Sequence, residues 1–449
     1  MNVLFVSLGC DKNLADSEEM LGALADRGFT ITDDENKADV IVVNTCSFIH
    51  AAMDESVQTL LEMSEYKKKG SCKALLVTGC LAQRFKDDIL QELPEVDAVF
   101  GTNSTDQLIP ILDRVLEGNR VSEFAPLTGL PRTSSRRMLT TGGHYAYLKI
   151  AEGCDKHCTY CVIPSLRGGY RSFPLEELVE KARDLVEQGV QELILVAQET
   201  TLYGVDLYGK KMLHTLLNEL CKLEDLKWIR VLYCYPEEIY PELIETMKNQ
   251  PKICHYLDLP IQHASDRILK RMGRKTSKED LVQLIGKLRE AMPDIVLRTT
   301  LITGFPGETE EDHHEVLDFI DEMEFDRLGV FTYSREDGTP AAAMPDQIDE
   351  EIKTARRDRI MELQQEISLD KGENRVGSVM DVVIEGKVAD EDAYIARSYA
   401  DAPGVDGYVF IENVTADLMS GTFVKVYIKA AMEYDLIGEL YDDEDESAE

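Results

Sequence analysis

Long apolar segments are missing from this sequence of 449 residues. No run of 18 or more apolar residues occurs, so no stretch has the length needed to cross a bilayer. Residues 1–6 lead straight into an apolar run and show neither a basic leader nor a cleavage signal. The composition, with 44% hydrophobic and 29% charged residues, is that of a soluble globular protein. We therefore expect no membrane contact and a cytoplasmic location.

Basic residues are also scarce. The chain has 48 Lys and Arg residues against 84 Asp and Glu residues, which gives a formal net charge of −36. Such a chain is repelled by phosphate backbones, so non-specific binding to nucleic acid is disfavoured. The same charge attracts a basic partner, although acidity can serve solubility alone. Composition leaves these two interpretations open.

A fourth metal ligand is missing from the densest cysteine cluster. Cys154, Cys158 and Cys161 lie on a loop that follows the apolar residues 145–150. A structural zinc site needs four ligands, and His157 is poorly placed because it is adjacent to Cys158. A four-iron four-sulfur cluster held by three cysteines, with one iron open to a small molecule, fits the spacing better. Ten cysteines without a secretory leader favour such chemistry over disulfides.

Residues 1–124 alternate between strand-like and helical stretches, which predicts an N-terminal doubly wound parallel α/β domain. Cys10, Cys46 and Cys80 each follow one of its strands. Because the carboxyl ends of parallel strands meet at one edge of a sheet, we expect these thiols to converge on a second cluster. The alternative is that each is an ordinary buried core residue. The expected strands are 3–8, 40–45, 74–78 and 96–100.

The central part of the chain predicts a partial barrel. A stretch containing proline and glycine, 125–143, predicts a linker, and residues 144–370 contain six βα units in series. This series favours a partial (β/α)6 barrel, with a doubly wound sheet as the alternative, and in both folds the chemistry belongs at the carboxyl ends of the strands. The expected strands are 145–150, 192–197, 229–234, 256–260, 296–302 and 328–333.

Polar and glycine residues follow several of these strands. Gln198 and Glu199 follow the second strand and can form hydrogen bonds with an ammonium or carboxylate group. Gly304 follows the fifth strand and allows the backbone to approach a cofactor closely. His313 and His314 are adjacent on an expected helix and are interpreted as part of a solvated face.

Short β runs separated by turns fill residues 371–441, which predicts a small five-stranded all-β, OB-like barrel. Barrels of this kind often bind single-stranded nucleic acid through basic and aromatic residues. This one has thirteen acidic against six basic residues, which weakens that expectation. Residues 442–449 are predicted to be an acidic tail.

The spacing of Cys154, Cys158 and Cys161, with Tyr160 before the last cysteine, resembles the radical S-adenosylmethionine (SAM) superfamily. In that superfamily, SAM chelates the open iron of a 4Fe-4S cluster, and electron transfer releases a 5′-deoxyadenosyl radical. The resemblance implies that the three cysteines hold such a cluster. It also implies that Tyr160, Gln198, Glu199 and Gly304 are candidates for binding SAM.

The combination of this loop with Cys10, Cys46 and Cys80 resembles the methylthiotransferases, and the resemblance covers nearly the whole chain. That family combines a second-cluster domain, a radical SAM barrel and a C-terminal TRAM module. Asp11, where the family usually has proline, and Glu199, where it usually has aspartate, depart from its pattern. The segments that resemble the ribosomal-protein branch rather than the tRNA branch are 7–13, 77–84, 197–204, 232–236, 257–265 and 397–403.

The resemblance implies a transferase that adds a methylthio group to the β-carbon of an aspartate in small-subunit ribosomal protein S-twelve, free or in the subunit. It implies two 4Fe-4S clusters, SAM as radical source and methyl donor, and an electron donor. Cys10, Cys46 and Cys80 would hold the second cluster, whose open iron presents the sulfur. A basic protein substrate suits the acidic C-terminal module, whereas the same charge disfavours contact with RNA. Two alternatives stay open, methylthiolation of a tRNA adenosine and a non-catalytic iron–sulfur redox or scaffold protein.

Overall fold

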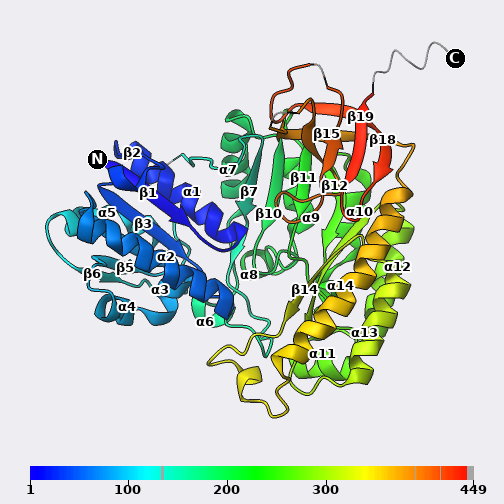
Figure 1. The fold of residues 1–449 in the computed structure, drawn as a ribbon, viewed down its shortest axis with the longest axis horizontal. Helices are drawn as coiled ribbons and strands as arrows, with labels where there is room; N and C mark the ends of the chain where they lie inside the picture. Colours follow the sequence, from blue (N-terminus) through cyan, green and yellow to red (C-terminus); the bar gives the residue numbers. More distant parts are fainter. Residues whose placement is uncertain (133–135, 390, 415, 442–449) are drawn as a thin grey trace.

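The computed structural model describes residues 1–132, 136–389, 391–414 and 416–441. Figure 1 shows an N-terminal part (blue to cyan) and a central part (green to yellow), each built on a sheet, and a small β-barrel (orange to red). Residues 133–135 of the expected linker and the expected tail, 442–449, lie outside the described residues. Among the residues described, no helix is both long and apolar enough to cross a membrane.

The N-terminal sheet has six parallel strands in the order β2-β1-β3-β4-β5-β6. Strands β3 and β4 are buried on both faces, which explains why they are continuous apolar runs in the sequence. Residues of these strands enter two apolar cores, one on each face, and helices complete both cores. This confirms the doubly wound α/β fold. The strands are β1 (Asn2–Ser7), β2 (Thr30–Ile31), β3 (Val40–Thr45), β4 (Ala74–Gly79), β5 (Ala98–Phe100) and β6 (Val121–Glu123), and the helices are α1 (Asp11–Asp26), α2 (His50–Lys69), α3 (Cys80–Phe85), α4 (Asp87–Glu92) and α5 (Leu108–Leu116).

The central sheet also has six parallel strands, in the consecutive order β14-β13-β12-β11-β10-β7. Consecutive order excludes the alternative of a doubly wound sheet. In the described part of the chain, β7 and β14 do not pair with each other, so the expected partial barrel is confirmed. Helix α14 packs along β14 and α13 (Figure 1). The strands are β7 (Tyr145–Lys149), β10 (Glu192–Val196), β11 (Trp228–Val231), β12 (Ile253–Asp258), β13 (Val296–Thr303) and β14 (Arg327–Thr332), and the helices are α7 (Leu175–Glu187), α8 (Val205–Tyr208), α9 (Leu213–Leu220), α10 (Pro241–Asn249), α11 (Asp266–Met272), α12 (Lys278–Ala291), α13 (Glu310–Met323) and α14 (Glu350–Glu373).

The C-terminal part is a closed barrel of five strands in the order β15-β16-β17-β19-β18, as expected. It is fixed to the amino ends of the central strands by a fully buried ionic cluster. Glu192, the first residue of β10, accepts hydrogen bonds from Arg230 at 2.9 Å and from Arg397 of β16 at 2.8 Å. The barrel therefore lies at the end of the central sheet opposite to the cysteine loop. Its strands are β15 (Val379–Lys387), β16 (Tyr394–Ser398), β17 (Val409–Ile411), β18 (Phe423–Ala431) and β19 (Leu436–Leu440).

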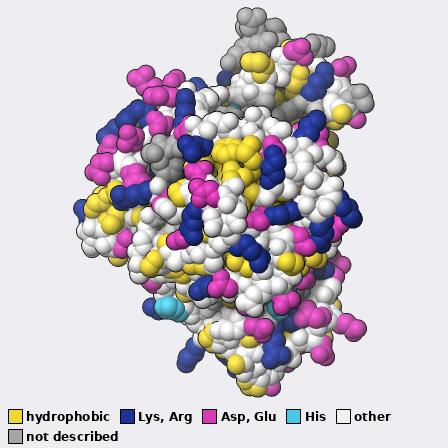
Figure 2. All heavy atoms as spheres, turned by 90° about the vertical axis from the view of Figure 1, so that its left-hand side faces the viewer, with side chains coloured by type: hydrophobic (Ala, Val, Ile, Leu, Met, Phe, Trp, Pro, Cys, Tyr) yellow, Lys and Arg dark blue, Asp and Glu magenta, His cyan; other side chains and the backbone are white. Residues whose placement is uncertain are grey.

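Charged residues of both signs cover the outer face of the N-terminal part. Figure 2 looks onto the left-hand side of Figure 1 and shows Lys and Arg side chains interspersed with Asp and Glu. The net charge of −36 therefore does not make this face uniformly acidic. A mixed pattern of this kind is typical of a solvated surface rather than of a groove for a phosphate backbone.

The interpretation of His313 as part of a solvated face is wrong. His314 lies at the surface, but His313 is only 1% exposed, and neither of its ring nitrogens has a hydrogen-bond partner among the described residues. Burial, together with the nearby Arg359 cation, lowers the pKa of His313 to about 4. Two adjacent histidines on a helix point in different directions, and their identity alone does not say which one faces the core.

The buried imidazole predicts a pH dependence of stability. The folded protein holds His313 neutral, whereas the unfolded chain protonates it near its ordinary pKa of 6.5. Stability is therefore intact above that value and is lost as the pH falls from about 6.5 toward 4. Urea unfolding measures the free energy of unfolding at pH 7 and at pH 4.5. In His313→Phe, which keeps a ring, we expect the fall between these two values to be about 1–2 kcal/mol smaller than in the wild type. The same change at the exposed His314 should leave the dependence intact, and equal effects of the two variants would contradict this account.

Candidate active site

The loop of residues 154–161 leaves the carboxyl end of β7 through a short strand, β8 (Ala151–Glu152). This strand pairs with β9 (Arg171–Ser172), so the loop is closed at its base. Gly153 has a φ of +75°, and a Cβ there would lie 2.1 Å from the carbonyl oxygen of Gly169. Only glycine fits such a close approach of two backbone segments. The loop with its three cysteines is thereby held at the mouth of the barrel.

The other three predicted cysteines share one edge of the N-terminal sheet. Cys10 follows β1, Cys46 follows β3 and Cys80 follows β4, and these strands are neighbours. A Cβ at Gly9 would lie 2.9 Å from the Sγ of Cys46, so the turn before Cys10 touches Cys46. Burial, with the nearby Cys80 and Cys10, raises the pKa of the Cys46 thiol to about 11. The structure thus brings these three cysteines together, whereas Cys72 precedes β4 at the opposite edge.

The donor atoms of both triads suit iron–sulfur clusters. Burial raises the pKa of Cys154 to about 11 and that of Cys161 to about 12, and Cys158 adds to both shifts. Thiols buried in this way need a cationic centre to be held as thiolates, which a cluster supplies. Among the described residues, no group of three His, Cys, Asp or Glu side chains is arranged to hold a metal ion. A four-iron cluster does not require its ligands to converge on one ion, because each cysteine binds a different iron.

Apolar packing brings the two triads close to each other. Cys80 packs against Val162 and Leu166, which follow Cys161 in the sequence, and the three form a small buried cluster. The hydroxyl of Thr102, from the N-terminal part, donates to the carbonyl of Leu166 at 2.8 Å. The segment after the first triad is therefore packed on a member of the second.

A short segment after β11, residues 233–235, contacts a cysteine of the first triad and the residue next to a cysteine of the second. The hydroxyl of Tyr235 lies 3.7 Å from the Sγ of Cys158. The hydroxyl of Tyr233 donates to the carboxylate of Asp11, the residue after Cys10, at 3.1 Å. This segment therefore borders the region between the two cysteine sites.

Four buried charged side chains join the N-terminal part to the barrel beneath this space. Arg167 pairs with Asp16 at 2.9 Å and with Glu152 at 3.1 Å. Lys149 pairs with Glu152 at 2.5 Å and also with Asp16, and Arg167 donates to the side chain of Asn13. Although burial alone would raise the pKa of Glu152, the cations of Lys149 and Arg167 lower it to about 2. The carboxylate of Glu152 is thus ionised at neutral pH.

The roles of these charged residues were not predicted from the sequence. A signal was present, because Lys149 is the one charged residue in the otherwise apolar strand β7. A charge in a buried strand needs a partner, but the sequence does not say that the partner comes from α1 of another part of the chain.

Two of the predicted SAM contacts have unused hydrogen-bonding capacity. Gln198 Oε1 and Glu199 Oε2 are buried and have no partner among the described residues, and the same is true of the hydroxyl of Tyr170. Burial raises the pKa of Glu199 to about 7, although a hydrogen bond from Thr201 lowers it in part. Glu199 is near enough to Cys154 for its charge to affect the pKa of that thiol. Such unpaired polar atoms at the barrel mouth fit a polar cofactor such as SAM.

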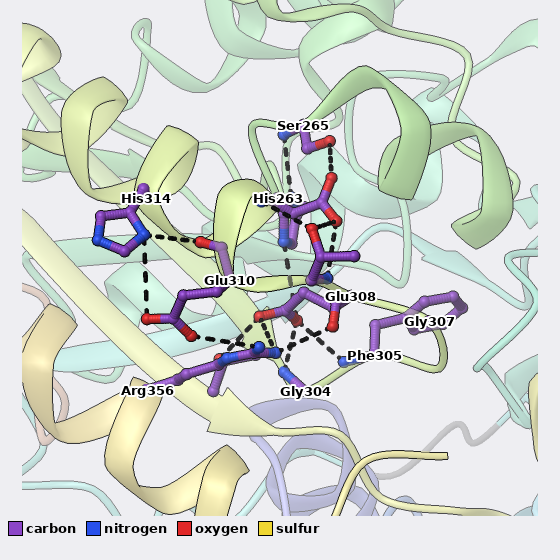
Figure 3. A network of polar contacts seen from close by, with 12 residues as sticks. His263, Ser265, Gly304, Phe305, Gly307, Glu308, Glu310, His314 and Arg356 are labelled. Atoms are coloured by element: carbon purple, nitrogen blue, oxygen red, sulfur yellow. Dashed lines mark hydrogen bonds and ion pairs between the residues drawn. The ribbon is translucent and has the colours of Figure 1, made fainter. Parts of the chain in front are cut away.

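Tyr160 and Gly304 are connected through Phe305. The ring of Tyr160 meets that of Phe305 edge to face, with 6.5 Å between centroids. Figure 3 shows Glu308 turned toward the backbone of Gly304 and Phe305, whose N–H groups donate to its carboxylate at 2.6 and 3.0 Å. The close approach at Gly304 is made by Lys353, because a Cβ there would lie 2.1 Å from the Cγ of that side chain. The packing of Lys353 therefore explains why residue 304 is a glycine. The contact of Gly304 with SAM stays a prediction.

Three sequence families match successive parts of the chain. Residues 2–101 match the family described as "Uncharacterized protein family UPF0004". Residues 148–320 match the radical SAM superfamily, and residues 376–440 match the TRAM domain.

Curated relatives match the chain over nearly its full length. A protein named "Ribosomal protein uS12 methylthiotransferase RimO" from Lachnoclostridium phytofermentans is 60% identical over 98% of this chain and 99% of its own length. A protein of the same name from Pelotomaculum thermopropionicum is 52% identical over 97% of this chain and 98% of its own length. Among solved structures, the radical SAM methyltransferase TsrM from Kitasatospora setae aligns with a TM-score of 0.56 at 14% identity, over 85% of this chain and 77% of that one. At that identity the structural likeness shows the fold alone.

We expect Arg167→Met to loosen the joint between the N-terminal part and the barrel. The variant keeps an unbranched apolar stem but removes the guanidinium, which leaves Asp16 and Glu152 with Lys149 as their remaining cation. Because breaking a buried ion pair exposes an uncompensated charge to an apolar interior, the free energy of unfolding should fall by roughly 3 kcal/mol. Urea unfolding of the metal-free chain measures this loss.

A matched control lies on the same two parts of the fold. Lys181 of α7 pairs with Glu19 of α1 at 3.0 Å, but both side chains are partly exposed. Lys181→Met should cost less than about 1 kcal/mol, because water already screens that pair. Equal losses in the two variants would show that burial does not increase the contribution of the network to the free energy of unfolding.

Proposed function

The chain belongs to the RimO family of ribosomal protein uS12 methylthiotransferases, and we propose on this basis that it adds a methylthio group to the β-carbon of an aspartate of uS12 (S-twelve). It is a radical SAM enzyme whose cofactors are SAM and two 4Fe-4S clusters. The observation that carries the proposal is that Cys80 packs against the segment after Cys161, while segment 233–235 contacts Cys158 and the residue after Cys10. We infer from these contacts that the two triads face one space. Membership of a transferase family sets aside the alternative of a non-catalytic scaffold.

We propose that each triad holds one cluster. Cys154, Cys158 and Cys161 are assigned to the SAM-cleaving cluster, and the second triad, formed by Cys10, Cys46 and Cys80, to the cluster that serves sulfur transfer. When bound, these groups and SAM supply the radical, the sulfur and the methyl group that the reaction needs. The support is the placement of each triad at the carboxyl ends of parallel strands, where ligands of such sheets bind.

The protein's own residues prepare the space between the triads. Gln198 and Glu199 offer carbonyl and carboxylate oxygens without other partners, and these can accept hydrogen bonds from an ammonium group of SAM. The rings of Tyr233 and Tyr235 are held at the border of this space. Cys154 and Cys158 are buried, so bulk water has little access to that side of the site.

Several finer assignments belong to the same proposal. Residues 1–124, 144–370 and 371–441 are assigned as the three domains and 125–143 as their linker, supported by the three family matches. Helix α14 ends at Glu373, so it joins the barrel to the TRAM module without a break. A ribosomal substrate implies action in the cytoplasm, an electron donor is required, and the acidic module favours a basic protein over RNA.

The substrate is tested by offering the reconstituted enzyme uS12 or tRNA. We expect uS12 to gain the mass of one methylthio group on an aspartate in the presence of SAM and reductant, and tRNA to gain none. Tandem mass spectrometry locates the modified residue. Modification of a tRNA adenosine instead would overturn the assignment to uS12.

Two cysteine variants serve as a matched pair in that assay. Cys46→Ala removes a member of the second triad, so we expect methylthiolation to be lost while 5′-deoxyadenosine is still released at the other triad. Cys72→Ala changes a cysteine that is equally buried but lies at the opposite edge of the sheet. The enzyme with this change should modify uS12 normally. Loss of transfer in both variants would contradict the assignment of the second triad.

A further inference from the structure

Lys12 is a buried lysine that has no ionic partner among the described residues. It lies in the first turn of α1, two residues after Cys10, and only 6% of it is exposed. Its ammonium group makes no hydrogen bond or ion pair among the described residues. Its one described contact is with the ring of Tyr233, whose centroid lies 3.1 Å away. The neighbouring carboxylate of Asp11 is engaged instead with the hydroxyl of Tyr233.

Both the burial and the position of this lysine are unfavourable for folding. A buried ammonium group without a counter-ion costs free energy. The amino end of a helix carries a partial positive charge, which opposes a cation in the first turn. The Tyr233 ring offsets part of this cost through its π face, but the ring carries no negative charge to pair with the ammonium. The same features make a good receptor for an anion, since the helix end and the ammonium attract it together.

Lys12 also lies where a substrate has to bind. Tyr233 stands two residues before Tyr235, which contacts Cys158 of the SAM-cleaving triad. Cys10, two residues before Lys12, belongs to the second triad. The ammonium thus lies close to the second triad, beside a ring that stands two residues before the one in contact with the first.

The ring that contacts Lys12 is held firmly. Tyr233 has a φ of +59°, a conformation that a residue with a side chain seldom adopts. Its N–H donates to Asp258 at 3.0 Å, and Asp258 pairs with Arg298 at 2.9 Å. Backbone strain that is retained in this way is typical of functional sites.

We propose that Lys12 binds the side-chain carboxylate of the acceptor aspartate. This inference rests on the proposed function and adds to it the residue that recognises the acidic side chain. The reacting β-carbon is directly attached to that carboxyl group, so a cation that holds the carboxylate positions the carbon between the two triads. An uncharged base offers no carboxylate, so Lys12 makes the site selective for an acidic side chain over a nucleobase.

The test compares two forms of uS12, the natural protein and one in which the acceptor aspartate is changed to asparagine. Their affinities for the reconstituted full-length enzyme are measured with SAM and without reductant, so that no turnover occurs. We expect the natural form to bind about tenfold more tightly, the difference that one charge-assisted hydrogen bond makes. In Lys12→Met this ratio should fall to about one through weaker binding of the natural form alone.

Two further variants complete the test. Lys12→Arg keeps the cation and should retain most of the preference. Lys73→Met removes a lysine at the opposite edge of the sheet and should leave the ratio unchanged. The proposal is overturned if the wild-type enzyme binds both forms equally, if Lys12→Met keeps the ratio, or if it weakens both forms alike. The proposed function fails separately, when the wild-type enzyme adds no methylthio group to uS12.

Discussion

The buried network of Asp16, Lys149, Glu152 and Arg167 is the constraint on which the rest of the site depends. Charges removed from water cost free energy unless they are paired, so these four side chains fix how α1 sits against β7 and the cysteine loop. Helix α1 begins directly after Cys10, and Glu152 stands two residues before Cys154. The network therefore positions the two triads relative to each other rather than merely joining two folds.

This constraint explains why the two cysteine triads, which belong to different sheets, lie near each other. A reaction that removes a hydrogen atom from a carbon and then attaches a methylthio group there needs both reacting sites within reach of one atom. Neither sheet alone can provide this, because each carries one triad at its own carboxyl edge. Only the docking of the two sheets brings both triads to one region, beside Tyr233, Tyr235 and Lys12.

Much of the fold was predictable because it follows from local patterns. The buried strands β3 and β4 are apolar throughout, and six βα units in series indicated the partial barrel. Strands β2 and β6 were missed, since runs of two or three residues have no periodicity. The meeting of Cys10, Cys46 and Cys80 at one edge of a sheet could be predicted from the sequence because strand ends mark that edge. Lys149 and Arg167 could not be connected with Asp16, and Lys12 could not be recognised as unpaired, because such contacts depend on how two domains dock. The TRAM module also lies at the amino ends of the barrel strands, so on the proposed function its acidic charge would act on a basic substrate at long range rather than inside the site.

The positions of iron in the reconstituted full-length enzyme test the central claim most directly. Anomalous diffraction at the iron edge, from crystals grown without oxygen, locates each cluster independently of any assumption about its ligands. The account predicts two clusters on the two sides of segment 233–235, one beside Cys154, Cys158 and Cys161 and the other beside Cys10, Cys46 and Cys80. A single cluster, or a second one bound by Cys221, Cys234 or Cys254, would contradict it.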